Sequence, residues 1–104
     1  MENTFGSHWN QGSALYAQGR FGDAAKSFRA ALAINPGSAE THFALGNALA
    51  AQGDVAGAEA ELRAAVAADP KMADGWNKLG ILLDKSKRRK GGMPLREYWR
   101  SRGV

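Results

Sequence analysis

Two nearly identical octapeptides lie 34 residues apart in this chain, AQGRFGDA at residues 17–24 and AQGDVAGA at residues 51–58. The same step relates further positions, among them Gly12 and Gly46. One more step extends the pattern to a third unit that begins near residue 73. A fixed period in this range indicates a stack of short repeated units, because each unit is one supersecondary element that packs only on its neighbours.

Within each unit, apolar side chains recur every three or four residues, a spacing typical of amphipathic helices. Gly19 and Gly53 are expected to end the first helix of their units, because glycine accepts the left-handed backbone that closes a helix. Pro36 and Pro70 are expected to end the second helix, since the residue before a proline disfavours helical geometry. The sequence therefore predicts helices over residues 5–17, 21–34, 39–51, 55–67 and 73–87.

Each octapeptide is then the turn between two antiparallel helices, followed by a small residue on which the neighbouring helix packs, Ala24 or Ala58. Helix pairs of this kind cannot bury their apolar faces alone, so they stack. We predict an all-α fold, an α-solenoid of stacked antiparallel helix pairs that is closed by a short C-terminal capping helix.

Composition excludes several classes of protein. At 104 residues the chain is expected to form one domain, which leaves little room for an enclosed catalytic pocket. It has no cysteine, no predicted strand followed by a phosphate-binding glycine loop, and no evident acid–base partner for Ser13. We expect neither catalysis nor a cofactor or metal. No export signal or membrane-spanning run is seen, so we expect a cytoplasmic protein, and the high alanine and glycine content suggests a bacterial source.

The repeated residues resemble the tetratricopeptide repeat, a 34-residue helix-turn-helix. The first unit, residues 5–38, carries the pattern in Gly12, Leu15, Gly19, Phe21, Ala24, Phe28, Ala31 and Pro36. The second, residues 39–72, carries it in Leu45, Gly46, Leu49, Gly53, Val55, Ala58, Leu62, Ala65 and Pro70. The third is partial, residues 73–92, and retains Trp76, Leu79, Gly80 and Leu83. Lys87 stands where the turn glycine is usual, and Gln11 and His8 depart from the pattern in the first unit.

The resemblance implies a right-handed superhelix over residues 1–92, in which the first helices line a concave groove that binds a peptide or protein segment. From the family's groove-facing places we select the candidate binding residues Trp9, Asn10, Ser13, Tyr16, Phe43, Asn47, Asn77, Lys78 and Ile81. Three of them are aromatic residues that the repeat core does not require, and such residues are enriched as anchors at interfaces. The alternative is that Trp9 and Phe43 only pack against adjacent helices or an N-terminal tail.

One subclass of these repeats clamps the acidic tail of heat-shock chaperones through basic residues and asparagine in the groove. Only Lys78 matches those places here, so a chaperone-tail binder is disfavoured. An asparagine ladder, known from sugar-transferring relatives, fails after Asn10.

Charge is distributed unevenly along the sequence. Residues 1–84 carry six basic and nine acidic side chains, a net of −3, whereas residues 85–104 carry eight basic side chains and Glu97, a net of +7. A basic run suits a helix C-terminus, where unpaired carbonyl groups carry partial negative charge. The candidate anion-binding residues, which would contact nucleic acid or an anionic membrane in a less favoured alternative, are Lys85, Lys87, Arg88, Arg89 and Lys90.

The last residues, 93–104, contain Leu95, Tyr98 and Trp99 on one side of a predicted short helix that begins near Pro94. This segment is expected to cap the stack in place of the missing second helix of the third unit. Alternatively, the exposed last helix pairs with another copy of the chain to form a homo-oligomer.

Overall fold

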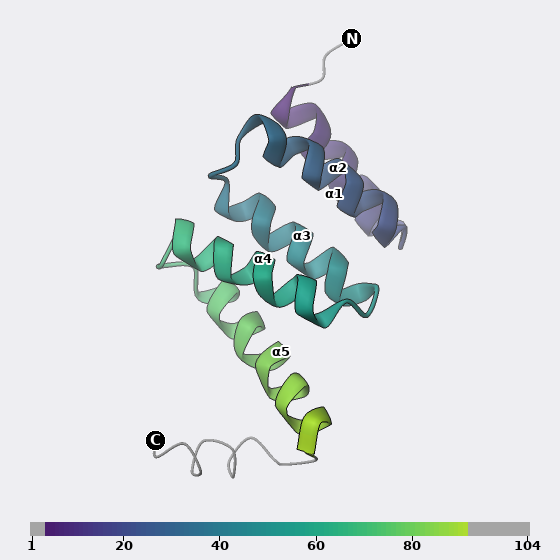
Figure 1. Ribbon diagram of the computed structural model, residues 1–104. Helices are drawn as coiled ribbons and strands as arrows, with labels where there is room; N and C mark the ends of the chain where they lie inside the picture. The colour runs from purple at the N-terminus through teal and green to yellow at the C-terminus, as the bar shows by residue number, and fades with distance from the viewer. Residues whose placement is uncertain (1–3, 92–104) are drawn as a thin grey trace.

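A computed structural model describes the backbone of residues 4–91 and the side chains of residues 4–84. This part of the chain folds into five helices without a strand, and their bounds are α1 (Phe5–Ala17), α2 (Phe21–Ile34), α3 (Ala39–Ala51), α4 (Val55–Ala68) and α5 (Ala73–Gly91). Figure 1 shows two antiparallel hairpins, α1 with α2 and α3 with α4, stacked so that α5 follows at the end. The predicted all-α solenoid is confirmed.

The helix ends agree with the sequence prediction except at two places. Helix α4 continues one residue further than predicted, and α5 continues to Gly91 instead of ending near residue 87. Lysine and arginine are good helix formers, and no glycine or proline interrupts residues 81–90, so nothing local ends the helix there. The capping segment predicted over residues 93–104 lies outside the described residues.

Each hairpin turn is closed by a glycine in the left-handed region. Gly19 has φ 81° and Gly53 has φ 89°, and they are the only positive-φ residues described between residues 4 and 91. In the first turn, the N–H of Arg20 donates to the carbonyl of Leu15 at 2.9 Å. In the second, the N–H of Asp54 donates to the carbonyl of Leu49, also at 2.9 Å. These are helix C-terminal caps, and they explain why the octapeptide repeats.

Short polar side chains cap the N-termini of three helices. Thr4 accepts a hydrogen bond from the N–H of Ser7 before α1, and Asp54 accepts one from the N–H of Gly57 before α4. Ser38 does the same for Thr41 before α3, and its hydroxyl also lies 2.8 Å from the hydroxyl of the fully buried Thr41. Each cap satisfies a backbone donor that the helix leaves unpaired, which stabilises the start of the helix.

The core runs along the stack and depends on small residues that let helices approach closely. Ala24 and Ala58, the residues that follow the two turns, are both fully buried, which confirms their predicted packing role. Phe28 of α2 packs against Gly12 of α1, where an added Cβ would lie only 2.7 Å from the ring. Leu62 of α4 occupies the equivalent place against Gly46 of α3, at 3.1 Å.

Because the Phe28 ring is buried and cannot move away, we expect Gly12→Ala to lower the free energy of unfolding by about 1–2 kcal/mol. The overpacking cost of ~1–3 kcal/mol exceeds the ~1 kcal/mol gained by replacing glycine with alanine in a helix. The matched control is Gly6→Ala in the same helix, where nothing lies within 4 Å. It should leave stability unchanged or raise it by up to about 1 kcal/mol. Urea unfolding followed by circular dichroism measures both, and equal effects would contradict the packing argument.

His42 connects three parts of the second unit. Its Nδ1 atom lies 2.7 Å from Oε1 of Glu61 on α4, and its Nε2 atom lies 2.8 Å from the carbonyl oxygen of Pro36. The side chain is therefore held between two helices and the preceding loop. The histidine therefore serves helix packing in the second unit.

Candidate binding groove

A cavity of about 300 Å³ opens between α1 and α3. Its lining residues come from α1, α2 and α3, and they are Trp9, Ser13, Tyr16, Phe28, Glu40, Phe43, Ala44 and Asn47. Most of this lining is apolar, and five of the nine residues proposed from the sequence are among the eight. The first helices of the two complete units thus provide seven of the lining residues, and Phe28 provides the eighth.

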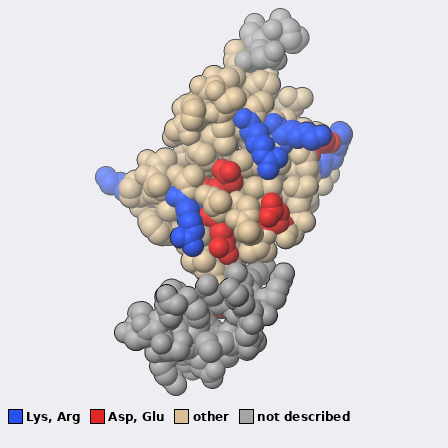
Figure 2. All heavy atoms as spheres, in the orientation of Figure 1, with Lys and Arg blue, Asp and Glu red and all other residues tan. Residues whose placement is uncertain are grey.

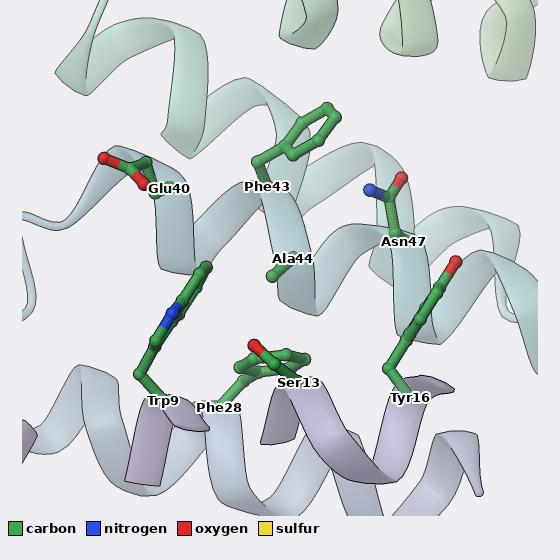
Figure 3. Close-up of a pocket in the computed structure, with 8 residues that line it drawn as sticks. All are labelled: Trp9, Ser13, Tyr16, Phe28, Glu40, Phe43, Ala44 and Asn47. Atoms are coloured by element: carbon green, nitrogen blue, oxygen red, sulfur yellow. The ribbon is translucent and has the colours of Figure 1, made fainter. Parts of the chain in front are cut away.

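Figure 3 shows how the aromatic side chains of the cavity are arranged. Trp9 and Tyr16 point from α1 toward α3, and Ser13 and Phe28 lie between them. The Trp9 ring contacts Phe28 with 5.5 Å between ring centroids, and the Tyr16 ring meets Phe21 edge-on at 5.1 Å. Both rings are therefore fixed by a second aromatic ring while remaining at the cavity. Trp9 and Phe43 pack partly against the core as well, so packing and groove lining occur together.

Asn47 adds a polar group to this apolar lining. Its Oδ1 atom is buried and has no hydrogen-bond partner among the residues that the structure describes. A buried acceptor without a partner is costly, about 1–3 kcal/mol, and calls for an explanation. The oxygen itself is almost inaccessible to solvent, so a molecule bound in the cavity would contact other atoms of Asn47.

A second cavity, of about 320 Å³, continues the first toward α5. Tyr16 and Asn47 line both cavities, so the two are parts of one groove. The second cavity adds residues from α3, α4, α5 and the second turn, namely Ala50, Ala51, Gly53, Val55, Lys78, Ile81 and Leu82. Lys78 is half-buried and is the only basic residue in the lining of either cavity.

The candidate residues differ in where the structure places them. Seven of the nine line the groove. Asn10 and Asn77 are exposed and line neither of these two cavities. The candidate anion-binding side chains at residues 85–90 lie outside the described side chains.

In the first cavity, Phe28 is the one lining residue outside the first helices, and the groove pattern missed it because it belongs to a second helix and fills a core position. Its ring reaches the cavity because Gly12, opposite it, has no side chain to cover it. The recurrence of glycine at residues 12, 46 and 80 was the signal in the sequence.

Surface charge in the described region is mixed. On the face shown in Figure 2, acidic side chains gather near the middle, basic ones lie nearer the edges, and most of the surface is uncharged. None of the helices within residues 4–91 is long and apolar enough to cross a bilayer.

Stacked helix hairpins with a groove along their first helices define an α-solenoid repeat protein. The tetratricopeptide repeat family matches residues 9–73 and, overlapping with them, residues 43–88. Together the matches cover most of the chain, which therefore belongs to the tetratricopeptide repeat family. No match was found among curated proteins. Tetratricopeptide repeats generally mediate contacts between proteins.

Proposed function

We propose that this protein is an interaction module that holds an extended segment of a partner protein in the groove along α1, α3 and α5. The observation that carries the proposal is the apolar cavity lined by Trp9, Tyr16 and Phe43, to which Asn47 adds a polar side chain. A volume of about 300 Å³ is at the lower end of the range for ligand sites, which suits one large side chain.

The bound segment is anchored by one large apolar or aromatic side chain. This side chain enters between the rings of Trp9 and Tyr16 and rests on Phe28, and Phe43 lines the same cavity. Tyr16 is 38% exposed, so a ligand that covers it removes apolar area from water. Rigid aromatic walls also lose little conformational freedom on binding, which favours affinity.

Asn47 binds the main chain of the segment beside the anchor. Its side chain lines both cavities, so its amide group is positioned to form a hydrogen bond with a backbone group of the ligand. A hydrogen bond of this kind does not depend on the side chains of the ligand. It fixes the position of the anchor along the groove.

Lys78 selects charge at the α5 end of the groove. As the only basic side chain in the lining of the two cavities, it favours an acidic side chain or a terminal carboxylate of the segment. Glu40 lies in the first cavity and disfavours acidic residues near the anchor. The preferred ligand is therefore an apolar anchor followed by an acidic group.

A displayed library of random 12-residue peptides tests the proposal. The intact chain should enrich peptides with one large apolar residue and a nearby acidic residue. Trp9→Ala should weaken binding of a selected peptide by about 30-fold, the effect of a hot-spot anchor, and Asn47→Ala by several-fold. Fluorescence anisotropy with the selected peptide measures both.

Lys78→Glu provides the charge test, and Lys71→Glu on the exposed loop before α5 is its matched control. Only the first should exchange the acidic preference for a basic one. Enrichment of the same peptides by the Trp9→Ala chain, or no enrichment by any variant, would reject groove binding.

A further inference from the structure

One face of helix α5 is equivalent, by the repeat, to the face of α3 that contacts α4. Trp76 and Gly80 of α5 are one repeat step after His42 and Gly46 of α3. The equivalence extends to hydrogen bonds, because Nε1 of Trp76 donates to the carbonyl of Pro70 at 2.8 Å. The His42 Nε2 atom has the same separation from the carbonyl of the equivalent proline.

This face of α5 has no helix packed on it among the described residues. Gly12 and Gly46 are buried beneath Phe28 and Leu62, whereas an added Cβ at Gly80 would meet nothing within 4 Å. Trp76 is 51% exposed. A large aromatic side chain and an open notch therefore lie one helical turn apart on the same surface.

In the first two units, a glycine turn reverses the chain so that a second helix packs on the first. The third unit has no such turn at the equivalent position, residue 87. Gly19 and Gly53 make that turn with positive φ, but Lys87 occupies the equivalent position and α5 continues past it to Gly91. Helices α2 and α4 cover Gly12 and Gly46, but no helix that follows a turn at this position covers Gly80 among the described residues.

The exposed face is complementary to itself. When two α5 helices pack antiparallel about a two-fold axis between residues 76 and 80, Trp76 of each copy meets the notch at Gly80 of the other. Closed two-fold contacts of this kind use one patch twice, so a single knob and a single notch are sufficient.

Charge favours the same antiparallel arrangement. Residues 85–90 of α5 include five basic residues, and parallel packing would place two such runs side by side. Antiparallel packing instead places each run beside the α4–α5 corner of the other copy. That corner carries Asp69, Lys71 and Asp74, a net negative charge.

We propose that a second copy of this chain covers the α5 face, which we define by Trp76 and Gly80, and that the protein is an antiparallel two-fold dimer. The groove stays accessible in this dimer, because its α5 lining comes from Lys78, Ile81 and Leu82 on another side of the helix. The dimer does not depend on peptide binding.

Sedimentation equilibrium of the full chain at several concentrations tests the proposal. The mass should rise with concentration from 11.1 kDa to twice that value. Trp76→Ala should raise the dissociation constant by at least about 30-fold. Gly80→Leu should abolish the dimer by filling the notch, and because leucine favours helix over glycine, the monomer should stay folded by circular dichroism. Trp9→Ala, a groove variant, should dimerise normally.

A chain that sediments as a monomer at every concentration overturns the proposal. In that case a second variant identifies the occupant. The triple substitution Leu95→Ser, Tyr98→Ser and Trp99→Ser removes the apolar side chains of the C-terminal segment. If this variant dimerises while the intact chain does not, the chain's own C-terminal segment covers the α5 face. Dimerisation that survives both Trp76→Ala and Gly80→Leu also overturns the proposal, because the contact then lies elsewhere.

Discussion

Phe28→Ala is expected to lower the free energy of unfolding by about 3–5 kcal/mol, the usual cost of removing a buried phenylalanine. Its side chain is 2% exposed, packs on Gly12 and contacts the Trp9 ring. Since small domains are stable by only about 5–15 kcal/mol, this loss brings the chain close to its unfolding threshold. Thermal and urea unfolding followed by far-ultraviolet circular dichroism measure the change.

The matched control is Phe43→Ala, which removes the same side chain from a partly buried position at the groove. It should cost less than half as much stability while abolishing binding of a groove-selected peptide. Phe28→Leu keeps most of the buried volume and should remain folded, so the stability series does not depend on one variant. Equal losses for Phe28→Ala and Phe43→Ala would show that the core does not centre on Phe28.

The second large effect is expected for Leu62→Ala, at about 2–5 kcal/mol. Leu62 is fully buried and holds α4 against Gly46 of α3. The hairpin of α3 and α4 is packed against α2 on one side and α5 on the other, so its loss removes neighbour contacts on both. We expect the whole described stack to melt earlier, by more than about 10 °C.

Ile34→Ala serves as the control for Leu62→Ala because Ile34 is 49% exposed at the end of α2. Its replacement should change the free energy of unfolding by no more than about 0.5 kcal/mol, as expected for a surface position. Differential scanning calorimetry compares the two variants. If Leu62→Ala melts like Ile34→Ala, the notch at Gly46 is not an important packing site.

The sequence was sufficient for the features that depend on local geometry. Left-handed glycines at residues 19 and 53 and prolines at 36 and 70 each lie two residues beyond a helix end, because each acts on the backbone beside it. The repeat step then determined which helices pair. The basic run predicts a helix end near residue 87, but α5 continues to Gly91 because lysine and arginine also favour helix.

The residues of the candidate groove could be predicted only in part from the sequence. Their positions within the repeat predict that Trp9, Tyr16 and Phe43 lie on one side of the first helices, since helical spacing determines which residues share a face. The repeat positions do not predict that Phe28 reaches the cavity or that Asn10 and Asn77 lie outside it. They also do not predict that Oδ1 of Asn47 has no hydrogen-bond partner among the described residues. Those features depend on how closely neighbouring helices approach.

By itself, the sequence determined the helices, their pairing and the family, because turn chemistry and a 34-residue step act through nearby residues. Tertiary structure alone decided the shape of the groove and which glycine notches are filled. Gly12, Gly46 and Gly80 read alike in the sequence, yet a side chain packs on the first two, and the third is open. The difference arises because a notch is filled only when a second helix returns to it, and that return depends on the path of the chain in space.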